Sequence, residues 1–237
     1  GYAVLTWNMR GCGADRNRLP SWYHSGQSAD LRAVVNHAAS RAFTRIHAVG
    51  ISVGGNILLK YLGEEGATAL HLISSATAVS VPMDLRGSAE ELAKRKNWIY
   101  MNYLLKPLRA RIREKARRFP HLFDTSRLES IRTFKEFDTL YTAPIHGFAS
   151  VDEYWETSSC LRFLNAIQIP TLIISALDDP FLSRSCFPFE PAQYSDVLSL
   201  ETPSWGGHVG FIDSLLLTRT WLDRRIVQNL ARHSPDT

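Results

Sequence analysis

The chain has 237 residues, of which 45% are hydrophobic and 21% charged, and its formal net charge is +4 at pH 7. This balance excludes a disordered chain and is sufficient for one sizeable core. No apolar stretch approaches the roughly 18 residues that a membrane-spanning helix needs. The three cysteines, Cys12, Cys160 and Cys186, fit neither a disulfide framework nor a zinc spacing. We therefore expect a reducing, cytoplasmic location, with association to a membrane left open.

The first eighty residues predict alternating strands and helices. Tyr2–Trp7 has the apolar character of a strand, and Ser28–Ala39 has apolar residues at the spacing of an amphipathic helix. Ile46–Val49 predicts a strand and Gly55–Leu62 the helix that follows it. Ala69–Ser75 predicts the next strand. This alternation is typical of an α/β fold with a mostly parallel, doubly wound sheet.

The alternation stops between about residue 81 and residue 150, where long helical stretches are interrupted by Pro107 and Pro120. A helical insertion at this point of an α/β fold is typical of a cap over one end of the sheet. We therefore predict three segments: a core half at 1–80, a helical cap at 81–150 and a second core half at 151–237.

The predicted cap carries a strong positive charge, because ten Lys or Arg residues but only one acid lie between Lys94 and Arg118. Apolar residues recur there at spacings of three and four, which predicts a pair of basic amphipathic helices with these residues inward: Trp98, Met101, Leu105, Leu108 and Ile112. One interpretation is a lid that contacts anionic membranes. The other, which we favour, is a stripe packed on the core with a solvated outer face. The segment has little aromatic interleaving, so we expect no nucleic-acid binding.

The last third of the chain returns to the α/β pattern. Ile169–Ala176 predicts a buried strand that ends at two adjacent aspartates, and a short strand around Val197–Leu200 follows. A glycine-rich loop, Gly206–Gly210, then carries a histidine. Trp221–Leu230 predicts a closing helix with its apolar face inward.

Ser52 lies in Gly50-Ile51-Ser52-Val53-Gly54, a G-x-S-x-G motif between the predicted strand and helix. A serine hydroxyl is a poor nucleophile, and this motif holds it out on a sharp turn whose glycines at 50 and 54 leave no room for side chains. The Val53 amide would then point at the reacting carbonyl as an oxyanion donor. A glycine-rich turn at a helix start is the alternative. The downstream order of Asp and His favours the catalytic interpretation, because it is the order of α/β-hydrolases.

His208 would take the proton of Ser52 and return it to the leaving alcohol, while Asp179 would hold the imidazole in the required tautomer. Asp178 stays open as an alternative acid, and its other predicted role is to cap the loop. Structural roles are favoured for two further histidines, His24 beside the sheet end and His146 at the hinge of the cap. The spacing of His208 and Asp213 formally matches an acyltransferase motif. We interpret Asp213 instead as a carboxylate at a helix N-terminus.

Several short motifs, taken together, resemble the YheT-like family of α/β-hydrolase-fold esterases, which are related to lipid-directed alpha/beta hydrolase domain-containing proteins. The resemblance covers nearly the whole chain and rests on these motifs: Arg10-Gly11-Cys12, Asn17-Arg18-Leu19, Tyr23-His24-Ser25-Gly26, Gly54-Gly55-Asn56, Ile145-His146-Gly147-Phe148, Asp178-Asp179-Pro180-Phe181 and Gly206-Gly207-His208-Val209-Gly210-Phe211. It implies the α/β-hydrolase fold, and it implies a catalytic triad of Ser52, Asp179 and His208.

Members of that family begin with three strands and a His-Gly oxyanion loop before the strand that corresponds to Tyr2–Trp7. The resemblance therefore implies that the chain is a fragment and that the second oxyanion donor lies outside it. It also implies that the strand before Ser52 lacks one neighbour, which would leave backbone groups unpaired.

We expect a serine hydrolase that cleaves carboxylic esters of lipophilic acyl groups through an acyl-enzyme, without a metal or another cofactor. Its expected partner is a small-molecule or lipid ester, and peripheral contact with an anionic membrane through the basic cap stays open. Two alternatives stay open: an acyltransferase, and a binding protein of the same fold without catalytic activity.

Overall fold

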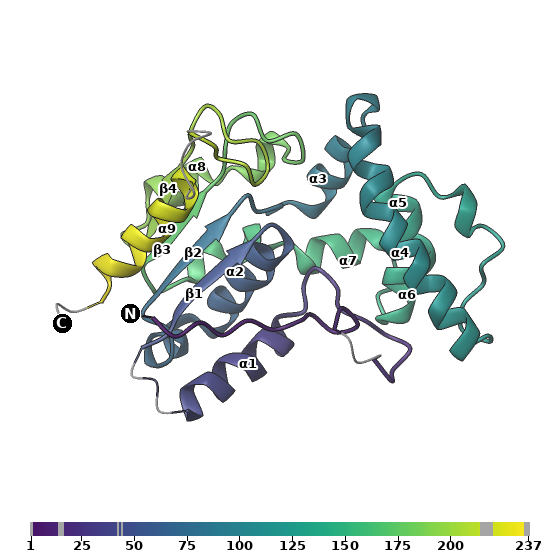
Figure 1. Ribbon diagram of the computed structural model, residues 1–237, viewed down its shortest axis with the longest axis horizontal. Helices are drawn as coiled ribbons and strands as arrows, with labels where there is room; N and C mark the ends of the chain where they lie inside the picture. Colours follow the sequence, from purple (N-terminus) through teal and green to yellow (C-terminus); the bar gives the residue numbers. More distant parts are fainter. Residues whose placement is uncertain (1, 14–16, 42, 44, 214–219, 235–237) are drawn as a thin grey trace.

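The computed structural model describes residues 2–13, 17–41, 43, 45–213 and 220–234. Four parallel strands form its sheet in the order β1-β2-β3-β4 (Figure 1). Their bounds are β1 at His47–Ile51, β2 at Ser75–Val79, β3 at Thr171–Ile174 and β4 at Leu198–Glu201. In the register of the sheet Ile51 lies beside Val79, Val79 beside Ile174, and Ile174 beside Glu201. The strands therefore end together at one edge.

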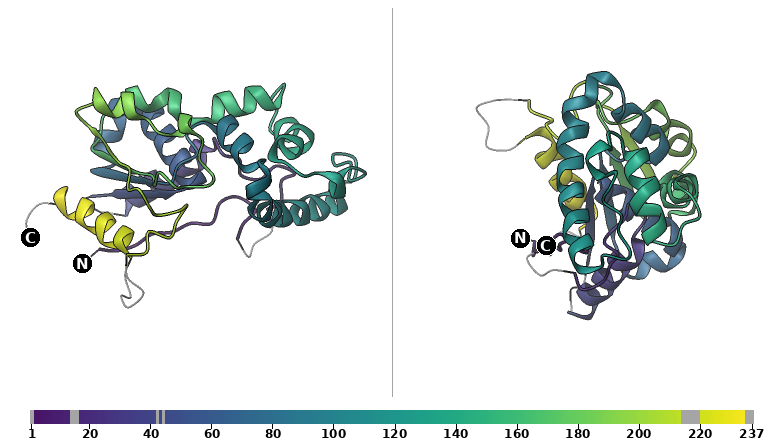
Figure 2. Two further views of the ribbon diagram at one scale, coloured as in Figure 1. Left: turned by 90° about the horizontal axis from the view of Figure 1, so that it is seen from above. Right: turned by 90° about the vertical axis from the view of Figure 1, so that its right-hand side faces the viewer.

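Helices cover both faces of this sheet, because the side chains of the central strands alternate between two apolar clusters. Ile173 packs with the helices α1 (Ser28–Ser40) and α2 (Val53–Glu65). Its neighbours on β3, Leu172 and Ile174, pack with α9 (Trp221–Arg232) on the other face. Figure 2 shows α9 and the blue helices on opposite sides of the sheet. The predicted α/β layers are thus confirmed.

Two predicted strands are wrong. Residues 2–7 run as an extended segment outside any strand of the described residues, with Val4 84% exposed. The second error falls at Ala69–Ser75, where a 3₁₀ helix, η1 (Gly66–His71), precedes β2. Ala69 and Ile73 are both buried, and the Ile73 amide donates to the Ala69 carbonyl at 2.8 Å. Their burial therefore follows a helical spacing of four, which a short apolar run does not distinguish from a strand.

A helical region extends from one end of the sheet, at the right of Figure 1. It contains α3 (Leu85–Leu92), η2 (Arg95–Asn97), α4 (Trp98–Arg118), η3 (Leu128–Ser130), α5 (Phe134–Phe137), a π-helix labelled η4 (Asp138–Thr142) and α6 (Ala143–Ile145). The chain then returns along α7 (Val151–Ser158) and the 3₁₀ helix η5 (Cys160–Ala166), and η6 (Arg184–Cys186) and α8 (Phe189–Gln193) lie between β3 and β4. None of the helices in the described ranges is both long and apolar enough to cross a bilayer.

The predicted pair of basic helices is one continuous helix, α4, which runs through Pro107. Proline has no N–H, so the carbonyl four residues earlier, at Tyr103, loses its helical partner. Tyr103 is 76% exposed, and water can serve that carbonyl instead. The inward stripe is also partly wrong, since Met101, Leu105 and Ile112 are buried whereas Trp98 is 60% exposed.

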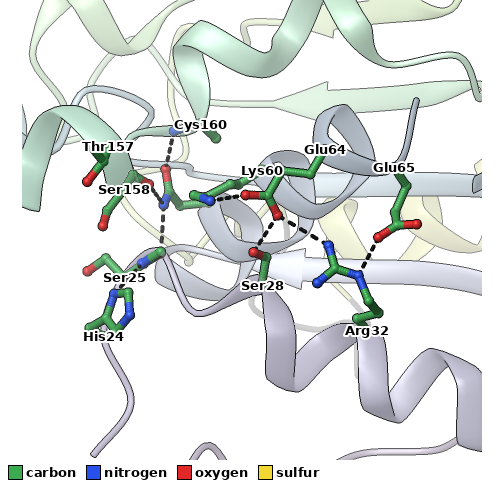
Figure 3. A network of polar contacts seen from close by, with 12 residues as sticks. His24, Ser25, Ser28, Arg32, Lys60, Glu64, Glu65, Thr157, Ser158 and Cys160 are labelled. Atoms are coloured by element: carbon green, nitrogen blue, oxygen red, sulfur yellow. Dashed lines mark hydrogen bonds and ion pairs between the residues drawn. The ribbon is translucent and has the colours of Figure 1, made fainter. Parts of the chain in front are cut away.

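Asn56 on α2 joins the core to the loop before α1 and to the segment that follows α7. It is fully buried, and its side-chain amide donates to the carbonyls of Ser25 and Ser158, each at 2.8 Å. Its carbonyl oxygen accepts from the Cys160 amide at 2.9 Å. Figure 3 shows this network with its three backbone partners labelled. One side chain therefore satisfies three backbone groups of two distant loops.

Asn56→Ala should lower the free energy of unfolding by about 2–5 kcal/mol, because it leaves three backbone groups without their partner in the protein interior. Urea unfolding followed by circular dichroism measures the difference. The matched control is Asn165→Ala on the exposed part of η5, which should change the free energy of unfolding by less than about 0.5 kcal/mol. Equal effects of the two substitutions would contradict the role given to Asn56.

Candidate functional site

Ser52 forms the turn between β1 and α2 with φ of 53° and ψ of −123°. A positive φ is unfavourable for a residue with a side chain, so the sheet must hold it in place. The Ser52 amide donates to the Val79 carbonyl of the neighbouring strand at 2.8 Å. Gly50 permits the sharp turn, because a Cβ there would lie 2.6 Å from the Gly54 carbonyl oxygen. The predicted strand-turn-helix around Ser52 is present.

The second glycine required by packing is Gly55, not Gly54 as the motif predicts. A Cβ at Gly55 would lie 2.5 Å from Val81 Cγ2, whereas a Cβ at Gly54 would contact only Met9 Cε, at 3.9 Å. The difference arises because Gly55 faces the sheet and Gly54 does not. Val53 is the first residue of α2, where backbone N–H groups have no partner within the helix.

His208 lies between Ser52 and Asp179 and contacts both. Its Nε2 lies 2.9 Å from Ser52 Oγ, and its Nδ1 lies 2.8 Å from Asp179 Oδ2. The Asp179 side chain is fully buried, and its second oxygen accepts from the Phe181 amide at 2.9 Å. The structure thus brings the three predicted site residues into one hydrogen-bonded chain that begins in the core and ends at the serine hydroxyl.

Asp178 points to the loop rather than to the imidazole. Its Oδ1 accepts from the amides of Gly206 and Gly207, at 2.9 and 2.8 Å. Because these residues immediately precede His208, the carboxylate fixes the start of the histidine loop. This arrangement matches the capping role predicted for Asp178 as the alternative to a catalytic one.

An apolar cavity of about 580 Å³ opens beside Ser52 and His208. Phe181 lies against the His208 ring, with 4.3 Å between the ring centroids. The helical region supplies most of the remaining wall, including these side chains: Leu85, Ala89, Leu92, Leu104, Leu108, Phe134 and Phe137. The volume and the apolar lining are those of a small-molecule site.

The two additional histidines and Asp213 have structural contacts. His24 Nδ1 accepts from the Gly26 amide at 3.2 Å, and the His24 ring lies 4.7 Å from that of His146. Burial lowers the pKa of each imidazole to about 4, so both are neutral at pH 7. Asp213 forms an ion pair with Arg224 of α9. It lies in a bend, and residues 214–219, where a helix would begin, lie outside the described residues, so its predicted position at a helix N-terminus stays a prediction.

Asp138 is a cavity residue that sequence reasoning missed. It begins the π-helix η4, and π-helical turns frequently occur at functional sites. The Trp155 Nε1–H donates to its carboxylate at 3.0 Å, and the Thr142 hydroxyl donates as well. Burial raises the pKa of Asp138 to about 6, because these two donors only partly replace water. An aspartate at helical spacing within a helix gives no signal in the sequence that it faces a cavity.

Comparison with known proteins agrees with this geometry. A sequence model of the alpha/beta hydrolase fold family matches residues 1–186. The chain is 35% identical over 236 residues to YheT of Escherichia coli (strain K12), a protein that is provisionally named an esterase. It is 30% identical over 239 residues to the mouse phospholipase ABHD3. These alignments cover 95% and 98% of this chain, but 67% of YheT and 58% of ABHD3.

Solved structures show the same fold at low sequence identity. The Pyrococcus furiosus esterase Pf2001 superposes with a TM-score of 0.55 at 16% identity, over 95% of this chain and 68% of that chain. A mutant of the meta-cleavage product hydrolase CumD superposes with a TM-score of 0.54 at 14% identity, over 96% of this chain and 79% of that chain. At such identities the similarity concerns the fold alone.

The raised pKa of Asp138 predicts a stability that falls as the pH rises. The folded state binds the proton more tightly than the unfolded chain, whose carboxyl has its ordinary pKa near 3.8. The free energy of unfolding therefore falls as the pH rises above about 3.8, and the loss is complete once the pH has passed through about 6. The difference in unfolding free energy between Asp138→Asn and wild type should therefore shift in favour of the variant by about 2–3 kcal/mol when the pH is raised from about 4 to about 7.5. Urea unfolding at both pH values measures this gain. Asp196→Asn, at an exposed position, should show none, and an equal pH dependence in both variants would contradict the assignment.

Proposed function

Since the chain belongs to the alpha/beta hydrolase family, we propose that it is a serine hydrolase that cleaves carboxylic esters of lipophilic acyl groups. The observation that carries this proposal is the hydrogen-bonded chain from Asp179 through His208 to Ser52, which ends at an apolar cavity. The names of YheT as an esterase and of ABHD3 as a phospholipase support the same class of reaction.

In this proposal Ser52 Oγ attacks the ester carbonyl carbon while His208 Nε2 takes the hydroxyl proton. The carbonyl oxygen becomes an oxyanion, and the Val53 amide N–H at the start of α2 donates to it. His208 then returns the proton to the leaving alcohol oxygen as the C–O bond breaks, which leaves the acyl group on Ser52. A water molecule activated by His208 releases the acid by the reverse sequence.

Asp179 acts through His208. Its buried carboxylate accepts the Nδ1–H, which keeps Nε2 as the acceptor that faces Ser52. It also stabilises the imidazolium that forms during attack. Phe181 supports this arrangement from two sides, since its amide donates to Asp179 and its ring covers the imidazole.

The preference for lipophilic acyl groups rests on the cavity wall. Apolar and aromatic side chains from α3, α4 and α5 surround the space next to Ser52, so an alkyl chain there is removed from water at a gain of roughly 0.8 kcal/mol per CH₂. We propose that residues 81–150 act as a cap, because they supply much of this wall while Ser52, Asp179 and His208 come from the core.

Ser52→Ala should abolish labelling by a fluorophosphonate probe and should lower ester hydrolysis by several orders of magnitude, since loss of a triad nucleophile lowers turnover by about 10⁶ in a studied protease. Gel fluorescence and hydrolysis of a p-nitrophenyl ester measure the two effects. Ser126→Ala, at an exposed serine of the helical region, is the control and should label as wild type does. Equal labelling of all three proteins would sink the assignment.

The two adjacent aspartates should differ sharply in kinetics. Asp179→Asn should lower kcat by roughly 10⁴ with little change in stability, because an amide favours the wrong imidazole tautomer. Asp178→Asn keeps an oxygen for the Gly206 and Gly207 amides, so it should retain most of the turnover. Steady-state kinetics of the two variants on one ester decides between them, and the reverse ranking would transfer the role to Asp178.

A further inference from the structure

The N-terminal half of α4 exposes large apolar side chains, three of them by more than half. Trp98 is 60% exposed, Ile99 61% and Tyr103 76%. Met101, Leu105 and Ile112 turn one side of the helix to the core, and Ile99 and Tyr103, which are one turn apart, lie on the side that faces away from it. Trp98 lies on the same side as Leu105 and Ile112, but in the first turn of the helix, where its side chain is exposed. Contiguous apolar residues on a surface, when basic or polar residues surround them, mark a site of interaction with a protein or a membrane.

Basic residues surround this apolar face. Lys94, Arg95 and Lys96 immediately precede it and Lys106 follows one turn after Tyr103, and all four are exposed. From residue 93 to residue 113 the sequence contains seven Lys or Arg residues and neither Asp nor Glu. Lys94 and Lys96 both pair with Glu91, which lies in the last turn of α3. The surface around Ile99 and Tyr103 thus combines exposed apolar side chains with basic ones.

The C-terminal half of α4 uses its basic residues differently. Arg109 donates to the Ile131 carbonyl at 2.6 Å, and Arg113 pairs with Glu129 at 2.5 Å. Lys115 is buried and donates to the carbonyls of Asn17 and Leu19, while Arg118 donates to the Asn17 carbonyl at 2.7 Å. These side chains hold neighbouring segments of the protein. The exposed Lys94, Arg95, Lys96 and Lys106 of the N-terminal half hold no such distant segment among the described residues, so their positive charge can reach an external partner.

The same half of α4 contacts Phe181, which packs against the candidate catalytic residue His208. The Tyr100 ring lies 5.0 Å from that of Phe181, and the Phe181 ring lies 4.3 Å from that of His208. Leu104, one turn further along the helix, lines the cavity. A partner that contacts the outer face is therefore only the width of one helix from the wall of the cavity.

We propose that this face, which we call the α4 docking face, binds the surface of an anionic lipid membrane. It is made of these residues: Lys94, Arg95, Lys96, Trp98, Ile99, Tyr103 and Lys106. Trp and Tyr favour the boundary between lipid headgroups and acyl chains, and Lys and Arg are attracted to anionic headgroups. The assignment rests on the proposed function in one respect, since it names the membrane as the source of the lipophilic ester.

Vesicle co-sedimentation tests this directly. Wild type should bind vesicles that mix phosphatidylcholine with phosphatidylglycerol and should bind pure phosphatidylcholine much more weakly, and high salt should reduce the first binding. Two variants divide the face into its parts. Trp98→Ser with Ile99→Ser and Tyr103→Ser removes the apolar contact, and glutamine at Lys94, Arg95, Lys96 and Lys106 removes the charge.

Each variant should weaken binding to the anionic vesicles by about tenfold or more. A matched control removes four exposed charges from other surfaces by glutamine substitution: Arg127, Lys135, Arg162 and Arg184. It should bind as wild type does. Unchanged hydrolysis of a short soluble ester verifies that every variant is folded, since no residue of the face touches Ser52, Asp179 or His208.

Wild type that fails to bind anionic vesicles, or an α4 variant that binds as well as the control, overturns the proposal. Sedimentation velocity then asks whether the apolar variant loses self-association that wild type shows, which would assign the face to a second copy of the chain. The Ser52→Ala protein separates the docking proposal from the proposed function. It should bind vesicles as wild type does, so a failure of catalysis leaves the docking test intact and a failure of docking leaves the assignment of Ser52 intact.

Discussion

The parallel register of the sheet is the constraint on which the candidate site depends. Because Ile51, Val79 and Ile174 are neighbours in the sheet, the segments that follow β1 and β3 leave it at the same edge. Ser52 and Asp179 are 127 positions apart in the chain, yet each follows a strand end within a few residues. A shift of one strand by a single residue would turn its side chains to the other face and would separate the serine from the acid. The bond from the Ser52 amide to the Val79 carbonyl extends the sheet to the turn itself.

The helical region depends on the core through a few polar contacts as well as through apolar packing. Asn56 satisfies backbone groups of the loop at Ser25 and of the segment at Ser158 and Cys160. Both segments border the site, because Ser25 lines the cavity and α7, which ends at Ser158, carries Tyr154 and Trp155 into its wall. The side chain of Asn56, one turn of helix after Ser52, therefore also sets the position of the cavity wall, and a packing change at Asn56 would reach the candidate site without contact with Ser52, Asp179 or His208.

Motifs in the sequence predicted those parts of the molecule in which local backbone geometry and chemistry coincide. The turn at Ser52 and the acid after β3 each follow the end of a predicted strand, and the histidine lies in a glycine-rich loop. The order of these three features in the chain was sufficient to predict that they lie together. The order could not separate Asp178 from Asp179, because loop register decides which carboxylate meets His208 and which meets the Gly206 amide. It also missed Asp138, since a carboxylate inside a helix faces water or a cavity according to tertiary packing alone.

The errors have a common physical origin. At Ala69–Ser75 an apolar run fits a strand and a helical turn equally well, and the 3₁₀ helix was decided by contacts of Ala69 and Ile73 with the core. On α4 the period of the apolar residues was correct, but Trp98 lies where the helix extends beyond the core, so nothing covers it among the described residues. The period of the apolar residues predicts on which face of the helix a side chain lies. It does not predict where along the helix the neighbouring layer ends.

The backbone of Ser52 shows how stability and reactivity oppose each other in this molecule. With φ of 53° the serine occupies a conformation that glycine adopts without strain, and a side chain there costs about 1–3 kcal/mol. A sequence selected for stability alone would place glycine at this position. The fold instead maintains a hydroxyl-bearing residue against its own conformational preference, and since folded proteins are stable by only about 5–15 kcal/mol, this single torsion is a substantial fraction of the total. Drift toward a more stable chain would therefore favour the loss of the Ser52 hydroxyl.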